Sequence, residues 1–466
     1  MKRQRLIRIL CVLLFLFIGL QAPVLAHVKW FSSFSFTHEP LTLREIFSPL
    51  FLSLLASCLV VIGALVFIDD RITRLSWYHK FSRQLSTHAS KSNLIVRIAT
   101  GAVLLLSWQS GALLVPELQV YNTWIEFIQL TLAIAILSNR YVKIAGYGLI
   151  CLYVFAFFKY GAIHLLDYAY LLGAGYYLTV SDSPNRKKRA SALPALYASV
   201  GFSLCWVALE KIVYPDWGIQ ILSQNPFLTL GFPPDLFLIF AAFVEFILGF
   251  LLIVCLLQRP IALAITLLFI STTLVFGKLE FIGHAIVHAA LIVFILQGTG
   301  NTFRTPITFF NRINQRIIFA ILSFSIIFIT MLMVYTGSAS RQYDIAMAKL
   351  EDDPHSKIME TASLDTPPIV GLQITEDKHG GWNLYLPTQN FTFSPEDCGK
   401  EHIDGFGHAH LYIDDQKVAR IYSDWYHLAD LPSGKYEIKV TLTSNNHSEY
   451  ALNGHPVSAK QTLIVM

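Results

Sequence analysis

The sequence contains few charged residues. Lys, Arg, Asp and Glu make up 14% of its 466 residues, whereas a typical soluble domain is about 25% charged. Apolar residues make up 54% of the chain, and the mean hydropathy is +0.52. Together with long apolar runs, these values exclude a soluble globular enzyme, a disordered chain and a coiled coil. We therefore expect a membrane protein with several spans, in contact with the lipid bilayer.

The chain also lacks the signatures of several enzyme classes. It has no nucleophile–base motif, nucleotide-binding loop or haem-attachment motif, so a serine-based or phosphoryl-transfer enzyme is not expected. Cysteines are scarce, and only Cys398 lies outside the apolar runs and the N-terminal segment. A disulfide framework within the chain is therefore excluded. No nucleic-acid partner is expected, and the sequence does not decide whether the protein is an enzyme.

Residues 1–26 have the three parts of a secretory signal peptide. Basic residues precede an apolar stretch, and small residues end it at Ala26. An uncleaved anchor helix is the alternative. Both interpretations place the segment 27–48 outside the cytoplasm. Cleavage after Ala26 would allow His27 to chelate copper through its amine and its ring nitrogen.

A transmembrane domain is expected over residues 49–336. Ten apolar stretches approach the roughly 20 residues that a span needs, and helices satisfy the backbone polar groups in lipid. If residue 27 lies outside, the inside loops carry 15 Lys and Arg, against 4 in the outside loops before residue 337. The positive-inside rule then places the C-terminal part outside the cytoplasm. We therefore expect a bacterial inner-membrane protein whose C-terminal part lies in the periplasm. The ten stretches are residues 49–68, 95–115, 122–138, 144–158, 162–179, 194–213, 234–257, 260–276, 282–298 and 317–336.

Two four-helix segments, residues 95–179 and 194–298, are predicted to be tandem repeats. Each has a glutamate in its second helix and a histidine at the start of its fourth helix, 38 and 39 residues apart. Ionisable groups in lipid face the bundle interior or a wet cavity. The sequence thus predicts an intramembrane polar cluster that holds a metal, relays protons, binds a quinone head group or only fixes helix packing. Its members are Glu126, His164, Asp167, Glu245, His284 and His288.

Four segments of the second repeat are informative together: Glu210–Pro215, Phe243–Gly249, Gly277-Lys278 and Ile282–His284. They resemble the DoxX-like family of four-helix bacterial membrane proteins. The resemblance is best over about residues 194–298 and weaker over 95–179. Some members of that family are membrane subunits of quinone-linked sulfur-compound oxidation or partners in redox homeostasis. The resemblance therefore implies a redox or quinone context without specifying a reaction.

The C-terminal part is acidic and rich in histidine. From Arg341 onward 10 Lys and Arg stand against 18 Asp and Glu, and eight of the fifteen histidines lie there. After a polar linker at 337–366, alternating runs separated by turn signals over 367–466 predict an all-β, immunoglobulin-like sandwich. The run Gly407–Ile413 resembles uncharacterised periplasmic domains, which adds no function. The expected strands are 371–375, 382–386, 408–413, 418–422, 436–442 and 458–465.

Residue types that ligate metals gather around one of these strands. His408 and His410 are two residues apart, so their side chains point to the same face of the sheet. Imidazole suits copper and zinc. The predicted metal ligands are His408, His410, Cys398 and His402, with His27 as an additional ligand. A polar strand face with loop histidines is the alternative.

The sequence therefore favours a bacterial inner-membrane protein that acts in redox or copper handling at the periplasmic face. Copper or zinc and a quinone are the expected cofactors, and a periplasmic or membrane redox protein is the expected partner. The alternatives are a non-catalytic assembly or interaction protein and a small-solute transporter. The inner halves of the spans have few ionisable groups, which disfavours a proton-coupled pump.

Overall fold

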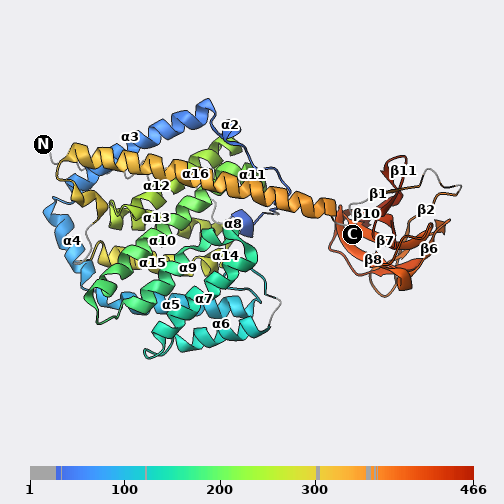
Figure 1. Ribbon diagram of the computed structural model, residues 1–466, viewed down its shortest axis with the longest axis horizontal. Helices are drawn as coiled ribbons and strands as arrows, with labels where there is room; N and C mark the ends of the chain where they lie inside the picture. The colour runs from blue at the N-terminus through green and yellow to red at the C-terminus, as the bar shows by residue number, and fades with distance from the viewer. Residues whose placement is uncertain are drawn as a thin grey trace. The chain divides into compact units, whose positions relative to one another are not determined.

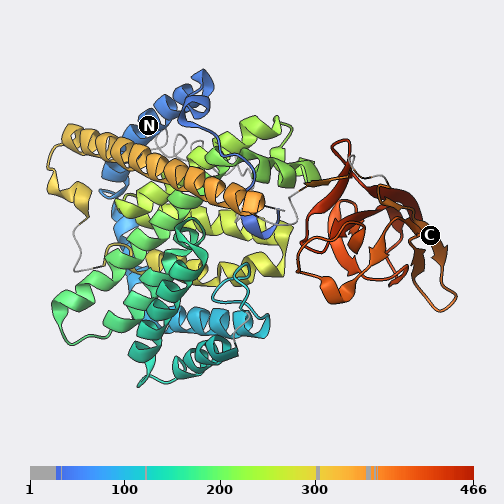
Figure 2. The same cartoon turned by 45° about the vertical axis from the view of Figure 1, so that its right-hand side comes forward.

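The computed structural model describes residues 28–32, 34–120, 123–300, 305–352, 358–361, 364 and 366–465. The predicted signal peptide and His27 lie outside these residues. The chain divides into two compact units, residues 1–343 and 344–466. The first unit is helical and the second contains β-sheets, as the sequence predicts (Figures 1 and 2).

Helices long and apolar enough to cross a bilayer form most of the first unit. Seven such helices occur among the described residues. They are α3 (Pro49–Ile72), α5 (Ser92–Gln109, preceded by the turn η2 at Ala89–Lys91), α7 (Val142–Tyr160), α10 (Arg186–Val213), α12 (Pro234–Ile253), α13 (Gln258–Phe276) and α16 (Ile313–Asp352).

Shorter helices connect or complement these seven. Two of them, α6 (Thr123–Ala135) and α15 (Ala285–Gln297), are apolar. The others are α2 (Leu43–Ile46), α4 (Ser76–Ser86), α8 (Ala162–Leu165), α9 (Tyr170–Val180), α11 (Pro215–Gln224) and α14 (Lys278–Gly283), with 3-10 turns η1 (Val28–Trp30), η3 (Leu166–Tyr168), η4 (Pro226–Thr229) and η5 (Pro306–Phe309).

Each of the ten predicted spans coincides with helical residues, but some are interrupted. The predicted span 162–179 is divided into α8, η3 and α9, and the span 282–298 begins in α14 and continues in α15. The helix predicted over 95–115 ends at Gln109, and a largely buried loop follows it. The structure thus places helices where the hydropathy predicts them, while the number of spans stays a prediction.

The two predicted repeats have the same pattern of helix contacts. In the first, α5 contacts α6, α6 contacts α7, α7 contacts α9, and α9 contacts α5. In the second, α10, α12, α13 and α15 form the same ring of contacts. The two rings meet where α9 packs on α10 and where α15 packs on α5. The first helix of each ring therefore contacts the fourth helix of the other, as a pseudo-twofold arrangement requires.

Helices α3 and α16 cover the second ring at α12. Phe51 of α3 packs against Phe243 of α12 and Phe328 of α16, with ring centroids 5.1 and 6.0 Å apart. Phe246 of α12 also packs on Phe328, at 4.7 Å. Aromatic rings at these separations stabilise a contact beyond the area that they bury. This layer ties the helices outside the repeats to the second ring.

Strand β10 (Gly434–Ser444) is the centre of the second unit. It pairs antiparallel with β7 (Phe406–Ile413) on one side and with β13 (Ser458–Val465) and β11 (Glu449–Leu452) on the other. A second sheet has the order β3-β4-β9. The remaining strands are β1 (Ile358–Glu360), β2 (Ile369–Val370), β3 (Gln373–Glu376), β4 (Trp382–Tyr385), β5 (Thr388–Gln389), β6 (Thr392–Phe393), β8 (Gln416–Ile421), β9 (Trp425–Leu428) and β12 (His455–Pro456).

The two main sheets share one apolar core. Leu384 and Leu428 of the smaller sheet are buried in the same cluster as Leu411 and Val440 of the larger sheet, which gives a sandwich-like domain. All six predicted strands coincide with observed ones, and the immunoglobulin topology stays a prediction. Part of the expected linker 337–366 is regular structure, since α16 continues to Asp352 and β1 pairs with β11.

Candidate functional site

Three potential metal ligands converge in the second unit. One ligand atom from each of Cys398, His408 and His447 lies within 4.8 Å of the other two. The Cys398 Sγ atom is 3.9 Å from His447 Nε2, and the ring centroids of His408 and His447 are 5.2 Å apart. Ligand atoms around a tetrahedral zinc lie about 3.3–3.8 Å apart, given metal–ligand bonds of 2.0–2.3 Å. The side chains therefore fit a metal ion with only a small contraction.

Three separate segments of the domain bring these ligands together. His408 lies in β7, Cys398 follows a 3-10 turn, and His447 lies in the turn between β10 and β11. Gly399 N donates to Asn445 O at 2.7 Å, and Ser394 Oγ donates to Asn445 Oδ1 at 2.8 Å. These bonds attach the segment of Cys398 to the turn of His447. These two hydrogen bonds therefore keep Cys398 and His447 close to each other.

Histidine His410 supports the cluster from beside it. As predicted from the two-residue spacing, the rings of His408 and His410 lie on one face, with their Nε2 atoms 3.0 Å apart. Lys417 Nζ is also 3.0 Å from His410 Nε2, and Thr443 Oγ1 is 3.2 Å from its Nδ1. Partners of this kind orient a ligating imidazole. His410 is thus placed to position His408 rather than to complete the group of three.

His402, another predicted metal ligand, does not join this group. Both ring nitrogens of His402 are engaged elsewhere, Nδ1 with Ser444 Oγ at 2.5 Å and Nε2 with Asp404 Oδ1 at 2.6 Å. His27 lies outside the described residues. Tyr422, in contrast, places its hydroxyl 3.6 Å from Cys398 Sγ. Burial and this contact raise the pKa of Tyr422, so the hydroxyl stays protonated beside the sulfur.

A second cluster is buried in the helical unit and is organised around Lys29. The Lys29 ammonium lies 2.7 Å from Asp167 Oδ2 and 2.8 Å from Glu210 Oε2. It also donates to Ile163 O at 3.3 Å. All three charged side chains are at most 1% exposed. The N-terminal segment therefore inserts a cation between residues of the two repeats, although the sequence places this segment in an outside loop.

Two further ionisable pairs are buried in the same unit. Lys211 Nζ lies 2.7 Å from Glu245 Oε2, and His284 Nδ1 lies 3.2 Å from Glu280 Oε1. Thr272 donates a hydrogen bond of 2.9 Å to Glu280. Removing water from ions is costly unless the ions are paired and hydrogen-bonded. These pairs therefore compensate part of the negative charge that is buried in the helical unit.

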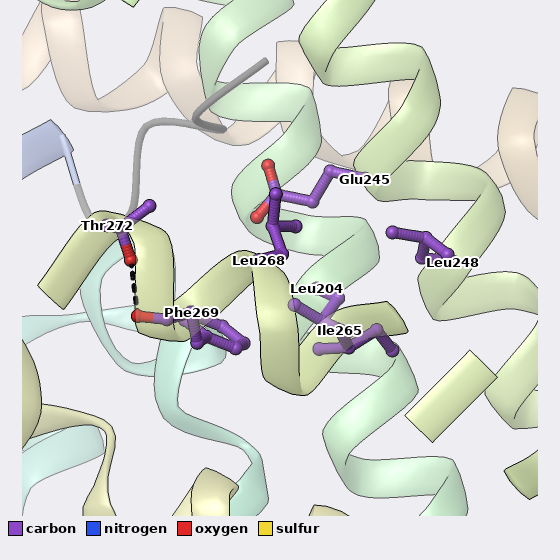
Figure 3. Close-up of a pocket in the computed structure, with 7 residues that line it drawn as sticks. All are labelled: Leu204, Glu245, Leu248, Ile265, Leu268, Phe269 and Thr272. Atoms are coloured by element: carbon purple, nitrogen blue, oxygen red, sulfur yellow. Dashed lines mark hydrogen bonds between the residues drawn. The ribbon is translucent and has the colours of Figure 1, made fainter. Parts of the chain in front are cut away.

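The predicted polar residues meet at two small cavities. One is lined by Asp167, Tyr170, Ser203, Glu245 and His284 together with apolar side chains. The other is more apolar, and Glu245 is the ionisable residue among the seven that line it. Figure 3 shows the Glu245 side chain projecting from α12 among Leu204, Phe269 and the other lining residues. Three of the six predicted residues, Asp167, Glu245 and His284, thus share one cavity.

The other three predicted residues lie apart from that cavity lining. His164 is half-buried and its Nδ1 lies 3.3 Å from Glu117 Oε1. His288 packs between Phe269 and Phe281. Glu126 is only half-buried, and the buried polar residue of α6 is Gln129, three positions later. Gln129 bonds to the backbone of Leu104, Ala112 and Leu114, so it fixes the loop after α5.

The predicted site residues do not include five ionisable members of these clusters. Glu210 and Lys211 were available as part of a family-like segment, and Glu280 lies four residues before His284, on the same helical face. The position of His447 depends on a turn that spacing along the chain does not reveal. The burial of Lys29 also had no signal in the sequence, because a lysine in a short loop is normally solvated. The five are Lys29, Glu210, Lys211, Glu280 and His447.

Comparison with known proteins identifies one family. The DoxX family model matches residues 208–278, from the end of α10 to the start of α14. The matched segment contains Glu210, Lys211 and Glu245, and it agrees with the DoxX-like resemblance found in the sequence. No curated protein and no solved structure matches the chain. The match supports a membrane protein of the DoxX type, and it lies entirely within the first unit.

Proposed function

We propose that this membrane protein of the DoxX type binds copper or zinc in its C-terminal domain and handles that metal at the periplasmic face of a bacterial inner membrane. The observation that carries the proposal is the convergence of Cys398, His408 and His447 within 4.8 Å. A thiolate with two imidazoles is a ligand set that copper and zinc favour over magnesium or calcium. The excess of basic residues in the predicted inside loops supports the periplasmic placement.

The chain's own residues have distinct tasks in this proposal. Cys398 supplies the thiolate, which selects thiophilic metals, while His408 and His447 supply nitrogen ligands. His410 orients His408, Lys417 in turn contacts His410, and Tyr422 closes the site next to the sulfur. A bound copper ion would supply one-electron chemistry, whereas zinc would not. The quinone predicted from the sequence stays a prediction.

A metal titration of the full-length protein in detergent tests this proposal. The protein is stripped with a chelator, kept reduced, and titrated with Cu(I) or Zn(II) against a competing chelator. We expect one equivalent of metal. Cys398→Ser and His447→Ala should weaken binding by at least about 100-fold, and His410→Ala by about 10–100-fold, as is typical for an orienting partner.

The matched control is His402→Ala, since His402 belongs to the same domain but is engaged with Ser444 and Asp404. Its affinity for metal should equal that of the unaltered chain. Equal weakening by His402→Ala and His447→Ala would contradict the assigned ligand set. Absence of stoichiometric binding of both metals would contradict the proposed function itself.

A further inference from the structure

The buried ionisable side chains of the helical unit do not balance in charge. Ion pairs, an adjacent position in the chain and a shared cavity lining connect them into one group. Two lysines face four carboxylates, so the net charge is −2 with His284 neutral and −1 with His284 protonated. The group consists of Lys29, Asp167, Glu210, Lys211, Glu245, Glu280 and His284, and each is at most 4% exposed.

Unbalanced charge in a low-dielectric interior is strongly unfavourable. The contacts among the described residues leave oxygens of this group without compensation. Asp167 Oδ1, Glu210 Oε1 and Glu280 Oε2 are buried and have no hydrogen-bond partner in the part of the chain that the structure describes. Since carboxylate oxygens only accept hydrogen bonds when ionised, each of these atoms calls for a proton or a cation. The group therefore requires positive charge that the described residues do not provide.

The cavity next to Asp167 offers a place for that charge. The polar residues among those that line it are Asp167, Tyr170, Ser203, Glu245 and His284. Among the described residues, only Cys398, His408 and His447 bring three metal-ligand atoms within 4.8 Å of one another. The residues that line the cavity thus do not bring three ligand atoms close enough together to coordinate a transition metal directly. Its oxygen-rich lining suits a small, hard cation.

We propose that this cavity binds a small monovalent cation, Na⁺ or a proton, which neutralises the carboxylates of the buried group. Lys29 acts as a tethered internal cation beside it, since it already compensates one charge of the Asp167 and Glu210 pair. The site is independent of the metal proposed for the C-terminal domain. The titratable groups around it are Lys29, Glu117, Tyr153, His164, Asp167, Tyr168, Tyr170, Cys205, Glu210, Lys211, Tyr214, Glu245, Glu280, His284, His288 and Tyr335.

Thermal unfolding of the full-length protein in detergent tests the proposal. The midpoint Tm is followed while NaCl replaces choline chloride at constant ionic strength, and the series is repeated from pH 5.5 to pH 8.5. If Na⁺ is the occupant, each tenfold increase above its Kd raises the folded-to-unfolded ratio about tenfold. If a proton is the occupant, Tm rises as pH falls and Na⁺ has no specific effect.

Variants on either side of the charge balance should respond in opposite directions. Asp167→Asn removes one negative charge and should reduce the dependence of Tm on Na⁺ or on protons. Lys29→Met removes the internal cation and should increase that dependence, so it keeps the test informative if Asp167→Asn does not fold. Lys278→Met is the control, because Lys278 is exposed at the start of α14.

Equilibrium binding of ²²Na⁺ and proton uptake, compared between the unaltered protein and Lys29→Met, measure the bound cation directly. Uptake of either cation in an amount that Lys29→Met increases supports the site. A Tm that responds neither to Na⁺ over choline nor to pH, or that responds equally in Asp167→Asn and the unaltered chain, would overturn it.

Discussion

At the scale of single residues, the three ligands of the proposed metal site come from separate segments of the C-terminal domain. The two-residue spacing in β7 correctly placed His408 and His410 together. It could not reveal His447, 37 residues further along, because turn geometry after β10 brings it there. In α6 the glutamate pattern indicated Glu126, whereas the buried face belongs to Gln129. A search restricted to ionisable residues overlooks such a neutral polar side chain.

The buried Lys211–Glu245 pair gives a prediction at this scale. Either Lys211→Met or Glu245→Gln alone leaves an unpaired charge, which should lower the free energy of unfolding by about 3–5 kcal/mol. The double variant removes both charges and should cost clearly less than the sum of the two. Chemical unfolding in detergent, analysed as a double-mutant cycle, measures the difference. Additive effects would show that the 2.7 Å contact carries no coupling.

At the scale of elements, each of the two repeats has a glycine between its third and fourth helices. Gly161 after α7 and Gly277 after α13 both have a positive φ, of 90° and 73°, a conformation that side chains disfavour. Each ends the third helix of its ring and starts an interrupted fourth helix. Hydropathy predicted both fourth spans as continuous, because an apolar run does not record where the backbone breaks.

Close helix packing in the second ring gives the prediction for elements. A Cβ atom on Gly201 of α10 would lie 2.5 Å from Gly249 O of α12, so Gly201→Ala should lower the free energy of unfolding by about 1–3 kcal/mol. The matched change Gly337→Ala in α16 meets no atom within 4 Å. It should be neutral or stabilise by up to about 1 kcal/mol through helix propensity. Unfolding in detergent compares the two, and equal effects would contradict close packing of α10 on α12.

At the scale of the whole molecule, composition anticipated the division into a helical unit and a β-rich unit. The apolar content and the alternating C-terminal runs each depend on many residues, so single exceptions do not change the result. The predicted orientation in the membrane depends on a few charges in the loops. The boundary between the helical and the β-rich unit depends on where the polar end of α16 stops. Both are set by local detail, and the composition of the predicted linker did not reveal that residues 337–352 continue α16.

The predicted orientation has a direct test in whole cells. In a chain without its native cysteines, Ser458→Cys in exposed β13 should react with a membrane-impermeant maleimide added from outside the inner membrane. Lys187→Cys, in the exposed basic first turn of α10, should react only after the membrane is permeabilised. The reverse pattern would place the second unit in the cytoplasm.

The central claim, a metal held by one sulfur and two imidazoles, is tested most directly by X-ray absorption spectroscopy of the copper- or zinc-loaded full-length protein. We predict one sulfur scatterer at about 2.3 Å and imidazole nitrogens at about 2.0 Å from a zinc ion, with the sulfur signal lost in Cys398→Ser. A spectrum with only nitrogen and oxygen neighbours, or one unchanged in Cys398→Ser, would contradict the site formed by Cys398, His408 and His447.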